Sequence, residues 1–320
     1  MHRTRVGVIR GGPTPAYELS LKTGAAALSA LSPERFETRD IFVDRSGQWH
    51  VRGMPVPPER ALSQIDVAVG AIHGAYGEDG TLSRLLETHA VPYVGADSFG
   101  HALALSKPIA KERLSQLGIL TPVATTLSRD ELSERSIIDL FRSFPQPSII
   151  KPLSGSASIG IFVARDFDSF ANGLIAALDA YPTVLIEEYI QGKEAVVGTI
   201  SQFRDEAVYA LPAVELDIDR GIGHFDYARK LSHTARHRSP AGFSSDEKQE
   251  LERIARAAHQ ALSMRHFGKH DLILSRRGVL YLESNALPEL HEGSPFALSL
   301  QAVGASPSSF LEHAIGLARR

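Results

Sequence analysis

The sequence predicts an α/β fold in which an open sheet is followed by a second, hairpin-based unit. Short apolar runs alternate with glycine-rich loops and helical segments over the first hundred residues, the pattern of an open α/β sheet. Further along, two apolar runs flank a small-residue loop at 154–158, which predicts a hairpin lid. A chain of 320 residues with 43% hydrophobic and 22% charged residues is typical of a globular protein with about two domains, or one large domain with subdomains.

The first elements are justified by apolar runs that end at glycine-rich turns. Proline at 108 is compatible with a helix start, because proline is tolerated in a first turn. In order, we predict a strand at 6–9, a turn-rich loop at 11–15, a helix at 18–31, a strand at 67–72, a helix at 82–89, a strand at 91–94 and a helix beginning near 106–108.

The second half continues with short strands. A capping box, Ser244-x-x-Glu247, marks one helix start, and the polar stretch 217–243 reads as a functional lid or a disordered loop. In order, we predict strands at 148–152 and 159–164, a helix at 168–180, strands at 184–189, 195–201 and 207–213, a helix at 244–264, and strands at 269–274 and 279–285.

Composition excludes several classes of function. The 34 Lys and Arg against 37 Asp and Glu give a net charge of −3, which offers no general case for nucleic acid or an anionic membrane. The absence of cysteine excludes disulfides, thiolate metal sites and cysteine nucleophiles. Neither a signal-peptide core nor a run of about 20 apolar residues occurs. We therefore expect a soluble cytoplasmic protein with no nucleic-acid or membrane partner.

The last predicted hairpin has polar residues in a pattern that suits a cation. With a turn centred near Arg277, Asp271 lies opposite Glu283. The same register places Lys269 opposite Asn285, and Asn285 shares a face with Glu283. Opposed carboxylates repel, and a bound cation removes that repulsion. All-oxygen ligands suit Mg²⁺, which usually brings substrate phosphates with it; the alternative is an exposed face in another register.

Three other segments give weaker signals. The loop 154–160, preceded by Lys151, can cradle phosphate with its backbone N–H groups, although such loops are often plain turns. The acidic strand end 187–190, with Glu194, can accept hydrogen bonds from adenine and ribose, or simply face solvent. The loop 73–80 follows a strand end, where ligands bind in open α/β sheets, and equally suits a tight turn.

A basic run at 229–238 lies inside the long polar stretch. It could contact nucleic acid, close over anionic phosphates or remain a solvated loop. His233 and His237 have i, i+4 spacing, but no neighbouring glutamate or helix signal supports a zinc site.

Together these segments resemble the D-alanine–D-alanine ligase family of the ATP-grasp fold over nearly the whole chain. The motifs are Gly11-Gly12 with Glu18 to Gly24, His73-Gly74 to Gly80-Thr81, Pro92 to Gly95, Lys151-Pro152 through Ser158-Ile159-Gly160, and Glu283-Ser284-Asn285-Ala286-Leu287-Pro288. The resemblance implies an N-terminal open α/β sheet domain at 1–105, a small central lid subdomain at 106–192 and a C-terminal catalytic subdomain at 193–320. It also implies ATP and Mg²⁺ (or Mn²⁺), amino-acid substrates and a homodimer as one expectation.

The resemblance implies a role for each matching residue. Nucleotide contacts are implied for Lys107, Lys151, Ser156, Ser158, Glu187, Glu188, Tyr189, Ile190, Glu194 and the lid lysine Lys230. Metal ligation is implied for Asp271, Glu283 and Asn285, and catalytic roles for Lys269, Lys230, Ser294 and His73. These three residues are also the candidate cation ligands that the register of the last hairpin brings together.

The amino-acid side of the resemblance is less faithful. The family has a polar constellation around the first substrate, and its members correspond here to the apolar Ala16, Ala157 and Leu231. Glu18, two residues beyond the first of these, could supply the missing carboxylate or could simply cap the helix.

The implied reaction starts when ATP phosphorylates the carboxylate of one amino acid. The amine of a second then attacks the acyl phosphate, giving a peptide bond, ADP and phosphate. The default product is D-alanyl-D-alanine for peptidoglycan, and the altered pocket motivates a ligase for a different amino acid or peptide. Lys269 replaces the family's arginine and Glu289 its glycine, which motivates a third hypothesis, a non-catalytic nucleotide-binding relative. The intact metal ligands argue against that third hypothesis.

Overall fold

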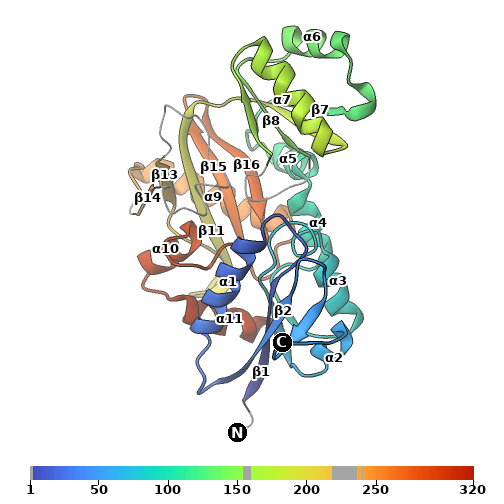
Figure 1. The fold of residues 1–320 in the computed structure, drawn as a ribbon. Coiled ribbons are helices and arrows are strands. Elements are labelled where there is room, and N and C mark those ends of the chain that lie inside the picture. Colours follow the sequence, from blue (N-terminus) through green and yellow to red (C-terminus); the bar gives the residue numbers. More distant parts are fainter. Residues whose placement is uncertain (1–2, 154–159, 218–235, 240) are drawn as a thin grey trace.

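The chain folds into three sheets, each covered by helices (Figure 1). The computed structural model describes residues 3–153, 160–217, 236–239 and 241–320. The mixed α/β class predicted from the sequence is confirmed. No helix within these ranges is long and apolar enough to cross a membrane.

The N-terminal sheet has the strand order β4-β3-β2-β1-β5-β6, and its four strands from β2 to β6 run parallel. Its elements are β1 (Thr4–Gly11), α1 (Tyr17–Ala30), β2 (Phe36–Val43), β3 (Trp49–Val51), β4 (Met54–Pro55), α2 (Pro58–Leu62), β5 (Val67–Gly70), α3 (Thr81–Thr88), β6 (Tyr93–Val94) and α4 (Ser98–Leu105). The loops that follow β1 and β5 leave the same edge of the sheet. Ligands bind at this edge in open α/β folds.

The central sheet is antiparallel, with the order β7-β10-β8-β9. The elements of this region are α5 (Lys107–Gln116), β7 (Ala124–Ser128), a 3₁₀ turn (Arg129–Glu131), α6 (Glu134–Ser143), β8 (Ser148–Pro152), β9 (Phe162–Ala164), α7 (Phe167–Ala180) and β10 (Thr183–Glu188). The apolar side of α7, including Phe170 and Leu174, packs on this sheet. The predicted pairing of β8 with β9 is confirmed, although β9 begins three residues later than predicted.

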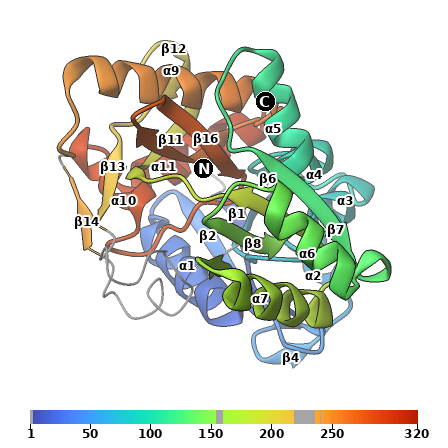
Figure 2. The same ribbon diagram turned by 90° about the horizontal axis from the view of Figure 1, so that it is seen from above.

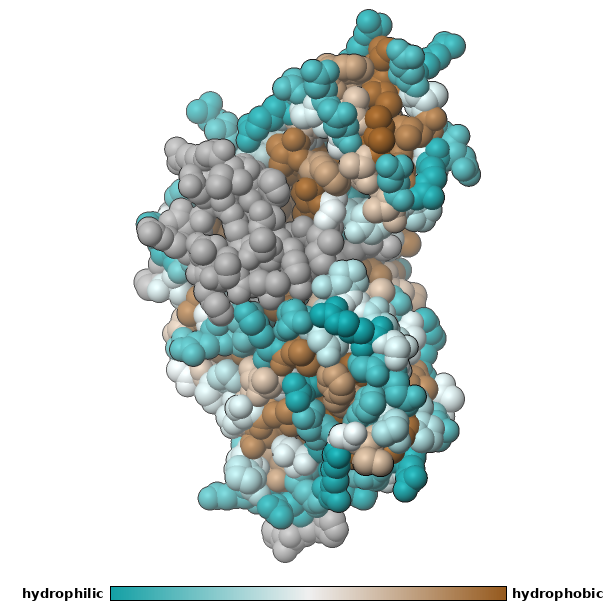
Figure 3. All heavy atoms as spheres, viewed as in Figure 1, coloured by the Kyte–Doolittle hydropathy of each residue, from teal (hydrophilic) through white to brown (hydrophobic). Residues whose placement is uncertain are grey.

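Exposed apolar side chains also occur in the unit built around the central sheet. Figure 3 shows brown surface there, and Phe167 and Ile175 of α7 are among the exposed large hydrophobic residues.

The C-terminal sheet has the order β14-β13-β11-β15-β16, with β12 paired to β11. Its region contains β11 (Gly192–Phe203), β12 (Glu206–Ala210), β13 (Val214–Asp217), β14 (Arg236–Arg238), α9 (Ser245–Ala261), β15 (Phe267–Ser275), β16 (Gly278–Asn285), α10 (Pro295–Ala302) and α11 (Pro307–Ala318). Helix α9 packs against this sheet (Figure 2), and the predicted capping box between Ser244 and Glu247 is confirmed.

The long polar stretch 217–243 is not loop throughout. Its first residue, Asp217, belongs to β13, which pairs antiparallel with β14 inside the stretch: Glu215 lies opposite Arg238 and Asp217 opposite Arg236. The prediction of a loop is therefore wrong at Asp217 and at 236–238. Charged residues at 215, 217, 236 and 238 obscured the strands, because such residues are uncommon in strand patterns.

Two hydrophobic cores cross the boundaries between the sheets. One core, here called the shared end core, joins strands β1 and β5 and helix α1 to helices α10 and α11. Its largest side chains include Phe36, Phe296 and Phe310, and the rings of Phe296 and Phe310 lie 5.1 Å apart. A second core joins α4 and α5 to α9 and the C-terminal sheet. The predicted domain boundaries at 105 and 192 stay predictions, because helices on one side of a boundary pack in the same core as elements on the other side.

Candidate functional site

The hairpin of β15 and β16 places the predicted metal ligands together. Asp271 pairs with Glu283, and Lys269 pairs with Asn285, as predicted. The turn itself is one residue shorter than predicted, because Ser275 pairs with Gly278. A β-bulge at Leu282 adds the missing residue and restores the predicted register for the polar pairs.

The donor set on this face fits a magnesium ion in its chemistry. It offers two carboxylates and one amide oxygen, the hard ligands that Mg²⁺ prefers. The Oδ1 atom of Asn285 accepts a hydrogen bond from the Leu287 amide at 2.6 Å, which fixes the side chain. In the ranges that the structure describes, no group of three or more His, Cys, Asp or Glu side chains is arranged to hold a metal. The set therefore depends on the amide of Asn285.

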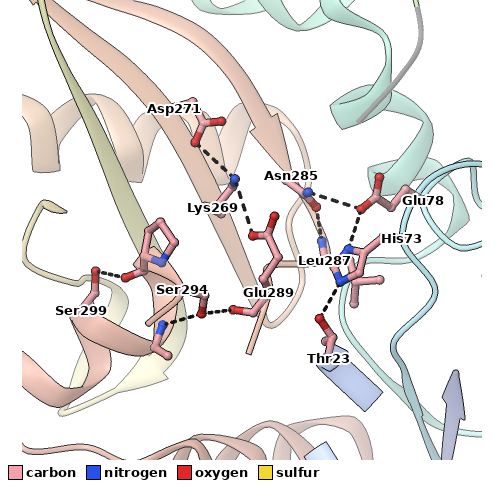
Figure 4. Close-up of polar contacts among 12 residues, drawn as sticks. Thr23, His73, Glu78, Lys269, Asp271, Asn285, Leu287, Glu289, Ser294 and Ser299 are labelled. Atoms are coloured by element: carbon pink, nitrogen blue, oxygen red, sulfur yellow. Dashed lines mark hydrogen bonds and ion pairs between the residues drawn. The ribbon is translucent and has the colours of Figure 1, made fainter. Parts of the chain in front are cut away.

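Two lysines neutralise these carboxylates. The Nζ atom of Lys107, at the start of α5, lies 3.4 Å from an oxygen of Glu283. The Nζ atom of Lys269 lies 3.5 Å from Asp271 and 3.7 Å from Glu289 (Figure 4). Burial disfavours the ammonium of Lys269, but the neighbouring carboxylates, Asp271 first, outweigh burial and raise its pKa. Lys269 is therefore a fixed cation beside the metal-ligand face.

The N-terminal unit reaches the same face through His73 and Glu78. The Nδ1 atom of His73 lies 3.1 Å from Oε1 of Glu78, and that oxygen accepts from the side-chain amide of Asn285 at 3.3 Å. On its other side, Nε2 of His73 lies 2.8 Å from the Thr23 hydroxyl (Figure 4). His73 thus lies two contacts from a predicted metal ligand. Glu78 was not among the predicted site residues, although it lies in the 73–80 motif.

A second ionic cluster lies under the central sheet and contains one lysine that the sequence analysis missed. Glu187, only 2% exposed, contacts Lys151 at 2.7 Å and Lys111 at 2.8 Å. Burial opposes the charge of Glu187, but the two lysines outweigh it and lower its pKa. Lys111 lies one helical turn after Lys107 on α5, and this i, i+4 spacing was the available signal.

The two lysines of this cluster behave differently. Burial outweighs Glu187 at Lys111 and lowers its pKa to about 8, with Lys151 adding repulsion. At Lys151, the attraction of Glu187 and Glu283 outweighs burial and raises the pKa. Two cations and one anion leave the cluster with excess positive charge, which suits a polyanionic ligand.

The remaining strand-end residues are partly engaged in structural contacts. A carboxylate oxygen of Glu188 accepts from the Val123 amide at 2.9 Å and from the Arg277 guanidinium at 2.7 Å. The Tyr189 amide donates to the Pro147 carbonyl, and Ile190 and Glu194 are half-buried. These contacts hold the end of β10 near the tip of the β15–β16 hairpin.

Ser294 lies at the start of α10. Its hydroxyl donates to the Glu289 carbonyl at 2.8 Å and accepts from the Ala297 amide at 3.4 Å. Glu18 lies in the first turn of α1, and its exposed carboxylate pairs with Arg45 at 3.0 Å. The N-cap residue of α1 is Ala16, and no side-chain capping hydrogen bond forms at this helix start. Both expectations for Glu18 therefore stay predictions.

Several predicted site residues lie outside the described residues. They are Ser156, Ala157 and Ser158 of the small-residue loop, Lys230 and Leu231 of the polar stretch, and most of the basic run 229–238. Of that run, Arg236 to Arg238 form β14. His237 Nδ1 lies 2.8 Å from the Gly293 carbonyl, which places the run's end beside the α10 loop.

Comparison with known proteins decides the family. A family model described as "D-ala D-ala ligase C-terminus" matches residues 114–316, and one described as "D-ala D-ala ligase N-terminus" matches residues 54–96. The chain belongs to the D-alanine–D-alanine ligase family. A relative named D-alanine–D-alanine ligase from Syntrophobacter fumaroxidans is 30% identical over 315 residues, covering 98% of this chain and 97% of the relative.

Solved structures show that this family member has the family's fold. The VanG D-Ala:D-Ser ligase from Enterococcus faecalis matches with a TM-score of 0.86 at 24% identity, covering 99% of this chain and 100% of that one. The D-alanine–D-alanine ligase from Bacillus anthracis, complexed with ATP, matches with a TM-score of 0.79 at 24% identity, covering 98% and 97%. The ATP-grasp fold implied by the resemblance is confirmed.

Proposed function

We propose that this protein is an ATP-dependent, ADP-forming D-alanine–D-alanine ligase that acts in the cytoplasm and supplies the dipeptide for peptidoglycan. The observation that carries the proposal is the polar face of the β15–β16 hairpin. It sets Asp271 opposite Glu283 and Lys269 opposite Asn285. This face combines hard metal ligands with a buried cation, and phosphoryl transfer depends on such groups to neutralise the charge of the phosphates.

The lysines around this face are the proposed nucleotide ligands. Lys107 and Lys151 lie at the start of α5 and on β8, where their ammonium groups balance phosphate charge. Asp271, Glu283 and Asn285 would hold the magnesium ion, which supplies charge neutralisation between phosphate oxygens when bound. Lys230 and the loop serines, Ser156 and Ser158, are proposed phosphate contacts on the strength of the motif match alone.

Lys269 is the proposed stabiliser of charge on the transferring phosphoryl group. It is held by Asp271 and Glu289, so its ammonium is oriented before substrate arrives. Ser294 and the start of α10 are proposed to bind the carboxylate of the second amino acid, because a helix N-terminus favours an anion. The amine of that amino acid then attacks the acyl phosphate, forming the peptide bond and releasing phosphate.

The first-substrate pocket favours a second candidate, a ligase of the same reaction class for a different first amino acid. Ala16 is 1% exposed and lies near Gly74, so this position brings an apolar methyl group to the loop beside His73. The carboxylate of Glu18, two residues further on, is exposed and pairs with Arg45. An ammonium-binding acid is therefore absent at this position.

A coupled assay tests both candidates. Purified protein is incubated with ATP, Mg²⁺ and D-alanine, and phosphate and D-alanyl-D-alanine are measured together. We expect both products in equal amounts, and Asp271→Asn is expected to abolish both while the exposed control Asp246→Asn leaves both unchanged. Phosphate release only with another amino acid supports the second candidate. ATP binding without turnover on any amino acid would instead support a non-catalytic relative.

A further inference from the structure

The bulge on β16 decides which face carries the metal ligands. The two-residue turn pairs Leu274 with Val279 and Leu272 with Tyr281. An unbulged continuation would place Glu283 on the same face as Tyr281, because alternate residues share a face. Tyr281 is fully buried in the core beneath α9. Without the bulge, Glu283 and Asn285 would therefore point into that core.

A hydrogen bond spans the bulge. The Tyr281 hydroxyl donates to Oγ of Ser284 at 2.9 Å. These residues are three apart, so a regular strand would place them on opposite faces. Their contact requires the extra residue, Leu282, between them. The Tyr281–Ser284 hydrogen bond is thus compatible only with the bulged register.

A cross-strand contact then fixes β16 against β15. Ser284 pairs with His270, and Oγ of Ser284 lies 2.7 Å from Nδ1 of the fully buried His270. His270 stands between Lys269 and Asp271 in the sequence, and Ser284 between Glu283 and Asn285. Each buried residue is therefore flanked by two residues of the polar face, on the other side of the sheet.

The contacts continue into the core. Thr199 Oγ1 lies 2.9 Å from Nε2 of His270 and 2.8 Å from Nδ1 of His259, whose Nε2 lies 2.9 Å from Ser201 Oγ. Donors and acceptors alternate consistently along this chain if Ser284 donates to a neutral His270, whose other nitrogen donates to Thr199. We call the residues Tyr281, Ser284, His270, Thr199, His259 and Ser201 the buried polar chain.

We propose that Tyr281, Ser284 and His270 act as a register lock that positions Asp271, Glu283 and Asn285 for the divalent cation. The inference rests on the proposed function, since the cation belongs to that reaction. The buried polar chain ties the lock to β11 and α9, so three strands and one helix hold the bulge. Loss of a partner leaves a buried polar group unsatisfied and removes the preference for the bulged register.

The test is a titration with Mn²⁺ in the presence of saturating ADP. Free Mn²⁺ is measured by electron paramagnetic resonance, which gives the Mn²⁺ affinity. Ser284→Ala is expected to weaken Mn²⁺ binding at least tenfold, and Ser284→Thr, which keeps the hydroxyl, to restore most of it. The matched control is Ser299→Ala, since Ser299 is also a buried serine but donates within its own helix, to the Pro295 carbonyl in α10. This control is expected to bind Mn²⁺ as the unmodified protein does.

A second readout separates register from stability. ADP affinity without metal is expected to stay within threefold in Ser284→Ala. Amide hydrogen exchange in 283–285 is expected to accelerate. Where Ser284→Ala fails to fold, Tyr281→Phe removes only the hydroxyl and is expected to weaken Mn²⁺ binding at least threefold. Unchanged Mn²⁺ affinity in either folded variant overturns the register lock. Intact Mn²⁺ binding without any ligase turnover overturns the proposed function instead.

Discussion

Replacement of Lys111 by methionine should stabilise the unliganded protein. Burial lowers the pKa of the Lys111 ammonium from 10.5 to about 8. At about 1.4 kcal/mol per unit, holding this amine charged costs about 3 kcal/mol at pH 7. Lys111→Met removes that cost and leaves Glu187 paired with Lys151 at 2.7 Å.

The stabilisation should depend on pH in a defined direction. Because the folded pKa lies below the unfolded one, the unfolded chain binds more protons between pH 8 and 10.5, and the stability of the unmodified protein rises with pH in this window. The advantage of Lys111→Met should therefore fall from about 3 kcal/mol at pH 7 to about 1 kcal/mol at pH 10.

Urea unfolding at pH 7, 8, 9 and 10 measures this difference directly. The exposed Lys248→Met is the matched control and should show a small, pH-independent difference. Glu187→Gln should act in the opposite direction and cost about 3–5 kcal/mol, because it leaves two buried lysines uncompensated. A Lys111→Met protein that is no more stable than the unmodified one at pH 7 refutes the reasoning.

Three further predictions concern ligands and catalysis. ATP binding at pH 8 should be accompanied by uptake of up to about half a proton, because phosphate charge raises the pKa of the half-protonated Lys111. Calorimetry in two buffers of different ionisation enthalpy measures the proton uptake from the difference in binding heat between the buffers. The same difference in Lys111→Met and in the unmodified protein would contradict this prediction. Lys269→Met should lower kcat about a hundredfold or more with a small change in the KM for ATP, whereas Lys269→Arg should retain most activity. A large rise in the KM for ATP would instead make Lys269 a ground-state ligand. Glu18→Gln should leave kcat and KM within about twofold, because its carboxylate pairs with Arg45 on the surface; a tenfold loss would place Glu18 in the site.

The sequence predicted the pairing of the metal ligands correctly because two deviations from the assumed hairpin cancel each other. Symmetry about Arg277 gave the right pairs at Asp271 and Glu283, but the turn is one residue tighter than that symmetry requires. The bulge at Leu282 makes up the difference. Nothing in the local pattern marks it, since Leu282 continues an apolar run. What selects the bulge is the buried partner of Ser284, and such tertiary contacts are invisible to periodicity.

Other parts of the site depended on contacts between distant segments. Glu78 meets Asn285 over a separation of 207 residues, and no spacing rule could have joined them. Lys111 follows Lys107 by one turn, but its burial against Glu187 follows from the packing of α5. Strand β2 was missed because its charged residues, including Glu37 and Arg39, mask the apolar alternation of a half-exposed strand.

The shared end core has a consequence for how the chain folds during synthesis. The inner residues of the first sheet, such as Val6 and Val67, pack against Phe296 and Phe310, which are made last. Helix α1 covers part of this face of the sheet, and the rest stays open until α10 and α11 have been translated. The N-terminal sheet can complete its core only after the C-terminal helices have been made. A nascent chain stalled before residue 296 should therefore be a substrate for chaperones and proteases rather than a folded domain.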